Sequence, residues 1–292
     1  MAIKICIDAG HYGKYNRSPA FPAYYESDMN WKLHLLLKAE LERYGIQVIT
    51  TRIKKDADRE LYQRGASSKG CDLFLSIHSN AVGSTVNEDV DYVAVYHLTE
   101  DAGTDVDDKS KALAALLAPV IADTMEVKQG GRIVSRKASS DKNKDGVLND
   151  NYYGVLNGAR QAGTPGLILE HSFHTNTRIT KWLMDDANLD KLAKAEAKVI
   201  AEYFGVAEPE QAKPVKTISA DLPVLKKGAK GDSVKAMQTL LIGYGFTMGK
   251  YGADGSFGGA TDRALKAYQA ANGLEADGSC GRKTWTKLLG LG

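Results

Sequence analysis

The stretch IKICIDAGH at residues 3–11 decides the fold. Its short apolar run at 3–7 is typical of a strand buried on both faces, and it leads through three residues to His11. The stretch LFLSIH at residues 73–78 repeats this arrangement, because its apolar run ends directly at His78. Two strands of this kind predict a parallel sheet in which both imidazoles emerge at the carboxyl ends of the strands, where open α/β sheets bind ligands.

Helical and strand-like segments alternate through the first 204 residues. Helical patterns cover residues 28–44, 57–69, 110–125 and about 180–204, and further strand-like runs cover residues 47–51, 91–97 and 167–169. Strands that alternate with helices predict βαβ units. We therefore expect an α/β fold with a mainly parallel twisted sheet and helices on both of its faces.

A segment that mixes proline with charge interrupts this pattern at residues 205–222. It has no apolar periodicity, as is typical of a linker. We therefore expect one domain at residues 1–204, a linker at 205–222 and a second domain at 223–292.

The second domain contains two weak copies of a helix-and-turn unit. Helical residues 231–241 are echoed by 260–269, and DGSFG at 254–258 is echoed by DGSCG at 277–281. This pattern predicts a small all-α domain. Residues 223–292 contain ten Lys and Arg against five Asp and Glu, a net charge of +5, which leaves −3 for the rest of the chain.

Composition indicates a folded chain, because 43% of its 292 residues are hydrophobic. The first residues lack the features of a secretory signal, and no apolar run is long enough to span a membrane. Cys6, Cys71 and Cys280 are too few and too scattered for a disulfide framework or a cysteine-rich zinc site.

Four side chains are candidates for a metal site at the carboxyl edge of the sheet. His11 and His78 offer imidazoles, Glu26 offers a carboxylate ligand, and Glu170 follows the strand-like run at 167–169. Two neutral imidazoles and one carboxylate leave the fourth zinc position free for water, whose proton a further glutamate can take. Spacing alone supports equally well two loop histidines and a glutamate favoured by a helix dipole.

Three motifs in this order favour the metal site: DAGH at 8–11, SIHSN at 76–80 and LEHSFHTN at 169–176. Together they resemble the zinc-dependent N-acetylmuramoyl-L-alanine amidases of bacteria and their phages, over about residues 1–204. The resemblance implies that one Zn²⁺ ion is bound by His11, Glu26 and His78. It also implies that Glu170 is the catalytic base.

The chain departs from the family pattern in places. Residues 12–17, YGKYNR, replace a glycine-rich stretch with a bulkier loop. His171 and His174 flank the third motif where many relatives have small or apolar residues, and we expect them to make ordinary hydrogen bonds. Asn80 and Asn176 could orient substrate, although asparagine after a strand is usually a turn residue.

Residues 141–149, DKNKDGVLN, match the first half of a calcium-binding loop. The twelfth position of such a loop requires a bidentate glutamate, and here it is Tyr152. We therefore expect a solvated turn.

The second domain resembles the small helical peptidoglycan-binding domain that accompanies many cell-wall hydrolases, over about residues 223–290. Its positive charge suits an anionic wall. No basic stripe with interleaved aromatic residues favours nucleic acid. The expected partner is bacterial cell-wall peptidoglycan, without nucleic acid or membrane insertion, and the expected state is a monomer.

The resemblance implies hydrolysis of the amide between N-acetylmuramic acid and L-alanine of peptidoglycan, with lysis of the wall. A zinc peptidase that cuts the stem peptide and an inert wall-binding protein remain alternatives. Without a signal, such an enzyme is expected to be made in the cytoplasm. It would reach the wall after holin-type release or lysis, as phage endolysins do.

Overall fold

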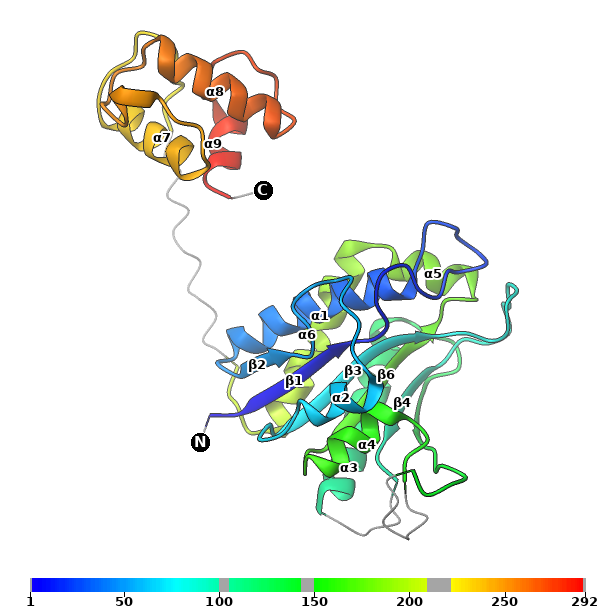
Figure 1. Cartoon of the computed structure of the whole chain (residues 1–292). Coiled ribbons are helices and arrows are strands. Elements are labelled where there is room, and N and C mark those ends of the chain that lie inside the picture. Colours follow the sequence, from blue (N-terminus) through cyan, green and yellow to red (C-terminus); the bar gives the residue numbers. More distant parts are fainter. Residues whose placement is uncertain (1, 100–104, 143–149, 209–221, 291–292) are drawn as a thin grey trace. The chain divides into compact units, whose positions relative to one another are not determined.

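The computed structural model describes residues 2–99, 105–142, 150–208 and 222–290. The chain divides into two compact units, Met1–Ala212 and Lys213–Gly292, and this division falls inside the segment expected as a linker (Figure 1). Residues 209–221 of that segment and residues 143–149 of the calcium-like stretch lie outside the described residues.

A six-stranded sheet forms the centre of the first unit, in the order β2-β1-β3-β6-β4-β5. Its strands are β1 (Lys4–Ala9), β2 (Gln47–Thr50), β3 (Leu73–Asn80), β4 (Val93–His97), β5 (Gly131–Ser135) and β6 (Gly166–Phe173). Neighbouring strands run parallel, except that β4 runs antiparallel to β6. The mainly parallel sheet predicted from the apolar runs is therefore confirmed.

Helices cover both faces of the sheet (Figure 1). Those of one face are α1 (Glu26–Arg43), α3 (Asp105–Thr124) and α6 (Asp186–Tyr203), and those of the other are α2 (Leu61–Ala66) and α4 (Gly154–Gln161). Side chains of β1 alternate between the layers: Ile5 and Ile7 join the core under α1, while Cys6 packs with Phe74 and the α4 side. Burial of both faces explains why the strands read as unbroken apolar runs.

The expected helix at residues 180–204 is wrong in one respect, because the chain forms two helices there. These are α5 (Thr177–Leu183) and α6, and Asp185 lies between them. The Asp185 side chain accepts hydrogen bonds from the backbone N–H groups of Ala187 at 2.8 Å and Asn188 at 3.4 Å. This cap begins a new helix, which apolar periodicity alone does not reveal.

Other boundaries differ as well. Helix α2 is shorter than the expected segment 57–69. Strand β5 was not expected, because its side chains are mostly exposed at the edge of the sheet and form no apolar run. Helix α4 was not expected either, since it spans only eight residues.

The second unit is helical, as predicted, and contains α7 (Asp232–Gly243), α8 (Gly259–Ala271), α9 (Arg282–Leu288) and the short 3₁₀ helix η2 (Gly249–Tyr251). Its core includes Met237, Leu265, Tyr268 and Trp285.

The sequence repeat of this unit appears as two matching hydrogen-bond networks, which we call the glutamine networks. In the first, the buried Gln238 donates through Nε2 to Asp254 Oδ1 at 2.9 Å, Ser256 O at 3.1 Å and Thr261 Oγ1 at 3.0 Å. Its Oε1 accepts from the N–H of Gly255 at 2.8 Å. The side-chain amide is thus satisfied on both sides.

Gln269 makes the second network with the same kinds of partner. It donates to Asp277 Oδ1 at 2.9 Å, Ser279 O at 3.0 Å and Thr284 Oγ1 at 3.2 Å, and it accepts from the N–H of Gly278 at 3.0 Å. Each glutamine therefore ties its helix to the Asp-Gly-Ser turn that precedes the next helix.

No helix among the described residues is long and apolar enough to cross a membrane. Cys6, Cys71 and Cys280 are buried and free.

Candidate metal centre

His11 lies in a sharp turn directly after β1. Its φ of 56° is in the left-handed region, which is unusual for a residue other than glycine. The buried Arg52 stabilises this turn, since its Nη2 donates to Ala9 O at 2.8 Å and also to His11 O. The turn brings the imidazole to the carboxyl edge of the sheet.

A bulge between β3 and β6 shapes the neighbouring part of the site. His78 pairs with Glu170, but two residues further on Asn80 pairs with Phe173, so β6 contains one extra residue. The φ of Ser172 is 56°, also in the left-handed region. Bulges next to active sites commonly redirect side chains, and here His78 and Glu170 lie side by side on one face of the sheet.

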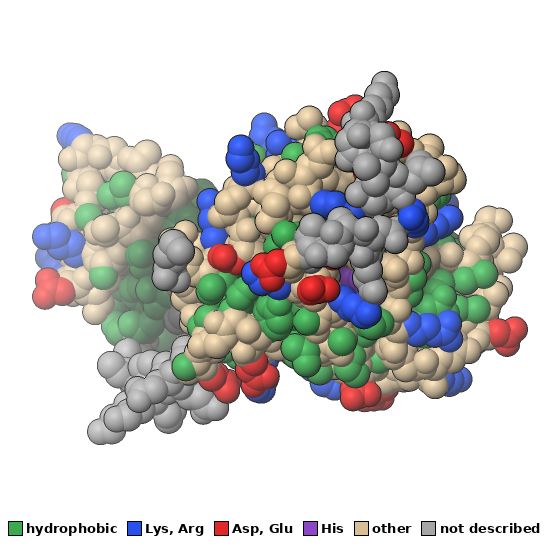
Figure 2. Space-filling model, turned by 90° about the horizontal axis from the view of Figure 1, so that it is seen from below, with side chains coloured by type: hydrophobic (Ala, Val, Ile, Leu, Met, Phe, Trp, Pro, Cys, Tyr) green, Lys and Arg blue, Asp and Glu red, His purple; other side chains and the backbone are tan. Residues whose placement is uncertain are grey.

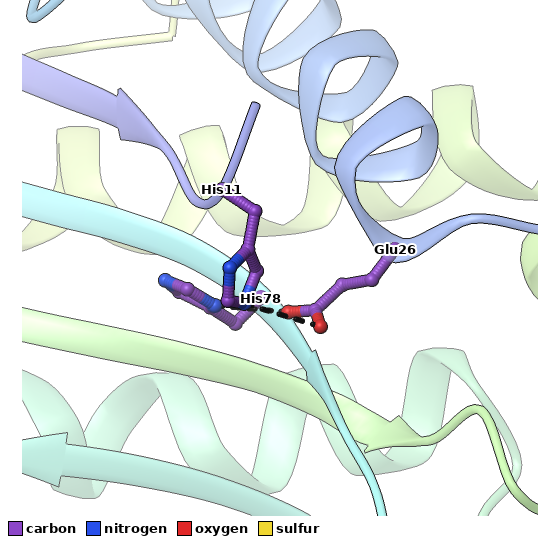
Figure 3. Close-up of side chains that lie close together, drawn as sticks. All are labelled: His11, Glu26 and His78. Carbon is purple, nitrogen blue, oxygen red and sulfur yellow. Dashed lines mark hydrogen bonds and ion pairs between the residues drawn. The ribbon is translucent and has the colours of Figure 1, made fainter. Parts of the chain in front are cut away.

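Glu26, the first residue of α1, points its carboxylate at both imidazoles from one side (Figure 3). Its Oε1 is 2.9 Å from His78 Nδ1, and its Oε2 is 3.3 Å from His11 Nε2. Ligand atoms of the three side chains all lie within 4.8 Å of one another. The structure thus brings together the three residues that the sequence singles out as ligands.

Polar neighbours hold the Glu26 carboxylate in place. Asn16 Nδ2 donates to Oε2 at 2.6 Å, while Asn30 Nδ2 at 3.4 Å and the backbone N–H of Ser79 at 3.1 Å reach Oε1. Burial alone would raise the pKa of Glu26, but its hydrogen bonds with His11 and His78 hold that pKa well below the usual range. Only 2% of the surface of Glu26 is exposed. A favourable interaction with the helix dipole does not require such burial, so it does not by itself explain the position of Glu26.

Glu170 lies next to this cluster without being part of it. Its Oε2 is buried and has no hydrogen-bond partner among the described residues. Burial raises the pKa of Glu170 well above the usual range, and the negative charge of Glu26 raises it further. A carboxyl group whose pKa is raised in this way is suited to take up and release a proton during a reaction.

The donor set fits a zinc ion. Two imidazole nitrogens and a carboxylate oxygen are ligands that zinc prefers, and three protein ligands are typical of catalytic sites. The unpartnered oxygen of Glu170 lies where a polar group that is absent from the protein itself would complete its bonding. A metal centre therefore accounts for both the convergence of His11, Glu26 and His78 and the state of Glu170.

A cavity of about 700 Å³ opens beside His11 and His78. Besides these two, its lining comprises Tyr12, Tyr15, Asp58, Arg59, Glu60, Leu61, Tyr62, Arg64 and Gly154. The Tyr15 ring stacks on His11 at a centroid distance of 4.7 Å, so the bulky loop at 12–17 forms one wall of the cavity. In Figure 2 a histidine side chain is partly visible at the surface, next to Lys and Arg side chains.

The two extra histidines are buried and hydrogen-bonded. His171 contacts His78 O through Nδ1 at 2.8 Å and Glu196 Oε1 through Nε2 at 2.6 Å. His174 Nδ1 lies 3.0 Å from both the hydroxyl and the carbonyl oxygen of Ser79. Both side chains are therefore hydrogen-bonded to β3 at or next to His78.

The two asparagines are also structural in their contacts. Asn176 is the N-cap of α5, where its Oδ1 accepts from the Ile179 N–H at 3.1 Å. Asn80 Oδ1 accepts from the backbone N–H of Ala81 at 2.8 Å.

Sequence reasoning missed Asn16 and Asn30, which hold Glu26. Asn30 follows Glu26 by four residues, so the helical spacing of α1 places both on one face, and this signal was present in the sequence. Asn16 has a φ of 51° in an irregular loop, and no periodicity points to it.

Two models of known protein families match the sequence of this chain. The model of the N-acetylmuramoyl-L-alanine amidase family matches residues 5–202, and a peptidoglycan-binding domain model matches residues 230–288.

Curated relatives match over shorter stretches. An N-acetylmuramoyl-L-alanine amidase of Bacillus licheniformis is 48% identical over 69 residues, which is 24% of this chain and 19% of that protein. A zinc D-Ala-D-Ala carboxypeptidase of Streptomyces albus G is 39% identical over 67 residues, 23% of this chain and 26% of that protein. The chain thus spans less than a third of the length of these relatives.

Solved structures share the fold of the first unit. The catalytic domain of the amidase CwlV from Bacillus (Paenibacillus) polymyxa has a TM-score of 0.53 at 22% identity, over 70% of this chain and 99% of that one. The amidase AmiC2 of Nostoc punctiforme has a TM-score of 0.53 at 24% identity, over 70% of this chain and 97% of that one. Because the family model covers most of the chain, this protein belongs to the N-acetylmuramoyl-L-alanine amidase family and carries a peptidoglycan-binding domain.

Proposed function

We propose that this chain is a zinc-dependent N-acetylmuramoyl-L-alanine amidase that hydrolyses the amide between N-acetylmuramic acid and L-alanine of peptidoglycan. The observation that carries the proposal is the cluster of His11, Glu26 and His78 beside Glu170, whose Oε2 has no partner among the described residues. The amidase named among the relatives supports the choice of bond.

The bond to be cut is an amide, which resonance makes a poor electrophile. His11, Glu26 and His78 would hold the metal through the nitrogen and oxygen atoms that converge between them. When bound, zinc supplies a Lewis acid that polarises a carbonyl and makes water more acidic.

Glu170 would move the proton in this reaction. Its raised pKa lets it accept a proton from the attacking water and then deliver that proton to the departing amine nitrogen. Protonation of the nitrogen matters because an amide ion is a poor leaving group. The cavity of about 700 Å³ beside His11 and His78 offers the substrate access to this side of the site.

The second unit would bind peptidoglycan and keep the enzyme near its substrate. Tethering raises the effective substrate concentration without adding a contact in the active site. Its net charge of +5 favours attraction to an anionic wall.

We also propose that the enzyme acts as a monomer and as an endolysin, made in the cytoplasm and released to the wall through a holin-type pore or by lysis. Support comes from the combination of a wall-hydrolase family with a peptidoglycan-binding unit. A bacterial autolysin would combine the same two parts.

The test is incubation of the purified chain with isolated cell-wall sacculi, with and without a chelator and with zinc restored. Release of free N-terminal alanine that is lost with the chelator, regained with zinc and absent in Glu170→Ala would support the amidase. Soluble products with a different new terminus would instead indicate a zinc peptidase. Binding to sacculi without any release would indicate an inert wall-binding protein.

A further inference from the structure

Both nitrogens of the His78 ring have a partner in the protein. Nδ1 faces Glu26 Oε1 at 2.9 Å, and Nε2 lies 3.1 Å from the hydroxyl oxygen of Ser76. Histidine ligands commonly depend on the hydrogen bond of the nitrogen that does not bind the metal, because that bond sets the tautomer and the orientation of the ring.

The direction of the Ser76 hydrogen bond follows from its other partner. The Ser76 hydroxyl donates to Asp8 Oδ2 at 2.8 Å, and a carboxylate can only accept. The Arg64 guanidinium forms an ion pair with the same carboxylate, with Nη1 3.7 Å from Asp8 Oδ2. Since a hydroxyl has one proton, Ser76 Oγ must accept from His78, which places a proton on Nε2 and makes Nδ1 the nitrogen that can bind a metal.

The sheet itself builds this arrangement. Asp8 of β1 pairs with Ser76 of β3, and His78 follows Ser76 by two residues, so the three side chains share one face. Asp8 and Ser76 are fully buried.

Gly10 keeps the ring in place from the other side. A β-carbon at Gly10 would lie 2.3 Å from both Cε1 and Nε2 of His78, so the ring occupies the space that any other residue would fill. The ring is therefore confined between Gly10 and Ser76.

We propose that Asp8, acting through Ser76, is a positioning residue that holds His78 as the tautomer with its proton on Nε2 and with Nδ1 directed at the metal. The two imidazoles then present different nitrogens, Nε2 from His11 and Nδ1 from His78. This inference rests on the proposed function only for the role of His78 as a ligand.

The first experiment records the ¹⁵N resonances of the histidine rings in the metal-free protein, in mildly alkaline buffer. The Nε2 of His78 is expected to carry a proton, and Ser76→Ala is expected to lose this preference. An Nε2 without a proton in the wild type, or an unchanged His78 signal in Ser76→Ala, would overturn the proposal.

The second experiment measures zinc affinity by competition with a chelator. Ser76→Ala and Asp8→Asn are expected to weaken binding by about 10- to 100-fold, the range found for such outer partners. Thr51→Val is the matched control, because Thr51 also donates to Asp8, at 2.5 Å, but has no link to His78. Its affinity should stay close to that of the wild type.

The outcomes separate this inference from the proposed function. If the wild type binds no zinc, the metal site fails, while the ring spectrum still decides the tautomer. If the wild type binds zinc and Ser76→Ala binds it equally well, the positioning role fails. Ser76→Ala removes a single hydroxyl, so the test stands even if Asp8→Asn does not fold.

Discussion

The two units of this protein bury polar side chains in opposite ways. In the glutamine networks, the side-chain amides of Gln238 and Gln269 have partners for both the nitrogen and the oxygen. Around the candidate metal centre, Glu170 Oε2 and Asn30 Oδ1 are buried without a partner among the described residues. A polar group that is satisfied within the fold stabilises it, whereas one left unsatisfied costs stability and indicates a ligand or a reaction.

Removal of a ligand of the candidate metal centre should have the largest effect on function in the first unit. His78→Ala should lose both bound zinc and alanine release, because only two of the three convergent donors remain. Metal content after dialysis and release from sacculi measure the two effects. As a control, His97→Ala removes a buried histidine whose ring contacts Leu98 O and which is not part of the cluster. Zinc retained in full by His78→Ala would show that the cluster is not the binding site.

A second variant separates proton transfer from metal binding. Glu170→Gln should lower the rate of amide hydrolysis by about 10²- to 10⁴-fold, the usual contribution of a general acid or base. It should keep zinc, since Glu170 is outside the three-residue cluster. Turnover is compared with metal content in the same preparation, and near-normal turnover would remove Glu170 from the mechanism.

In the other unit, the expected effect is on folding. Gln269→Ala should lower the free energy of unfolding of the second unit by about 2–4 kcal/mol, because it leaves the Gly278 N–H unpaired and opens a cavity. Chemical denaturation of the whole chain, followed by the NMR signal of the indole N–H of Trp285, which donates to Pro223 O at 3.0 Å, measures this loss in the second unit.

The exposed Gln63 provides the control for that experiment, as Gln63→Ala should leave stability almost unchanged. Catalysis on a small soluble substrate should stay intact in Gln269→Ala. A stable second unit in this variant would mean that its network does not support the fold.

The smallest expected effect tests directly whether the buried carboxylate of Glu170 costs stability, in contrast to the satisfied glutamines of the second unit. Glu170→Gln should stabilise the metal-free first unit by about 1 kcal/mol at neutral pH, because it removes a buried charge next to Glu26. The pKa of Glu170 is raised on folding, so the ionised group destabilises the fold above the ordinary carboxyl pKa. The gain should therefore vanish as the pH falls below that value and should grow as the pH rises. Unfolding measured as a function of pH tests this, and a loss of stability in the variant at neutral pH would contradict it.

The sequence predicts that His11, His78 and Glu170 lie at one edge of the sheet, because each follows a buried apolar run. In the structure His11 follows β1, whereas His78 and Glu170 lie within the carboxyl-terminal parts of β3 and β6. Parallel strands bring these ends to one edge, so the geometry of the site follows from the fold class. Glu26 was less evident, since its approach to the imidazoles depends on how α1 packs on the sheet.

What the sequence does not reveal depends on long-range contacts or on exposed elements. The Ser76 to Asp8 hydrogen bond joins residues 68 positions apart, and no local pattern indicates it. The extra residue in β6 is equally hidden, because a bulge leaves the apolar run unchanged. Strand β5 lacks the buried faces that make a strand recognisable.

The two glutamine networks also differ in one respect that bears on engineering. Gln238 and Asp254 are 16 positions apart, whereas Gln269 and Asp277 are only 8 apart, yet both pairs close at 2.9 Å. The chain between helix and turn can therefore change in length without altering the closure. The longer connection, residues 244–253, contributes the buried Met248 to the core, so its exposed part at Gly249–Tyr251 is the place to insert a peptide tag or a fluorescent reporter.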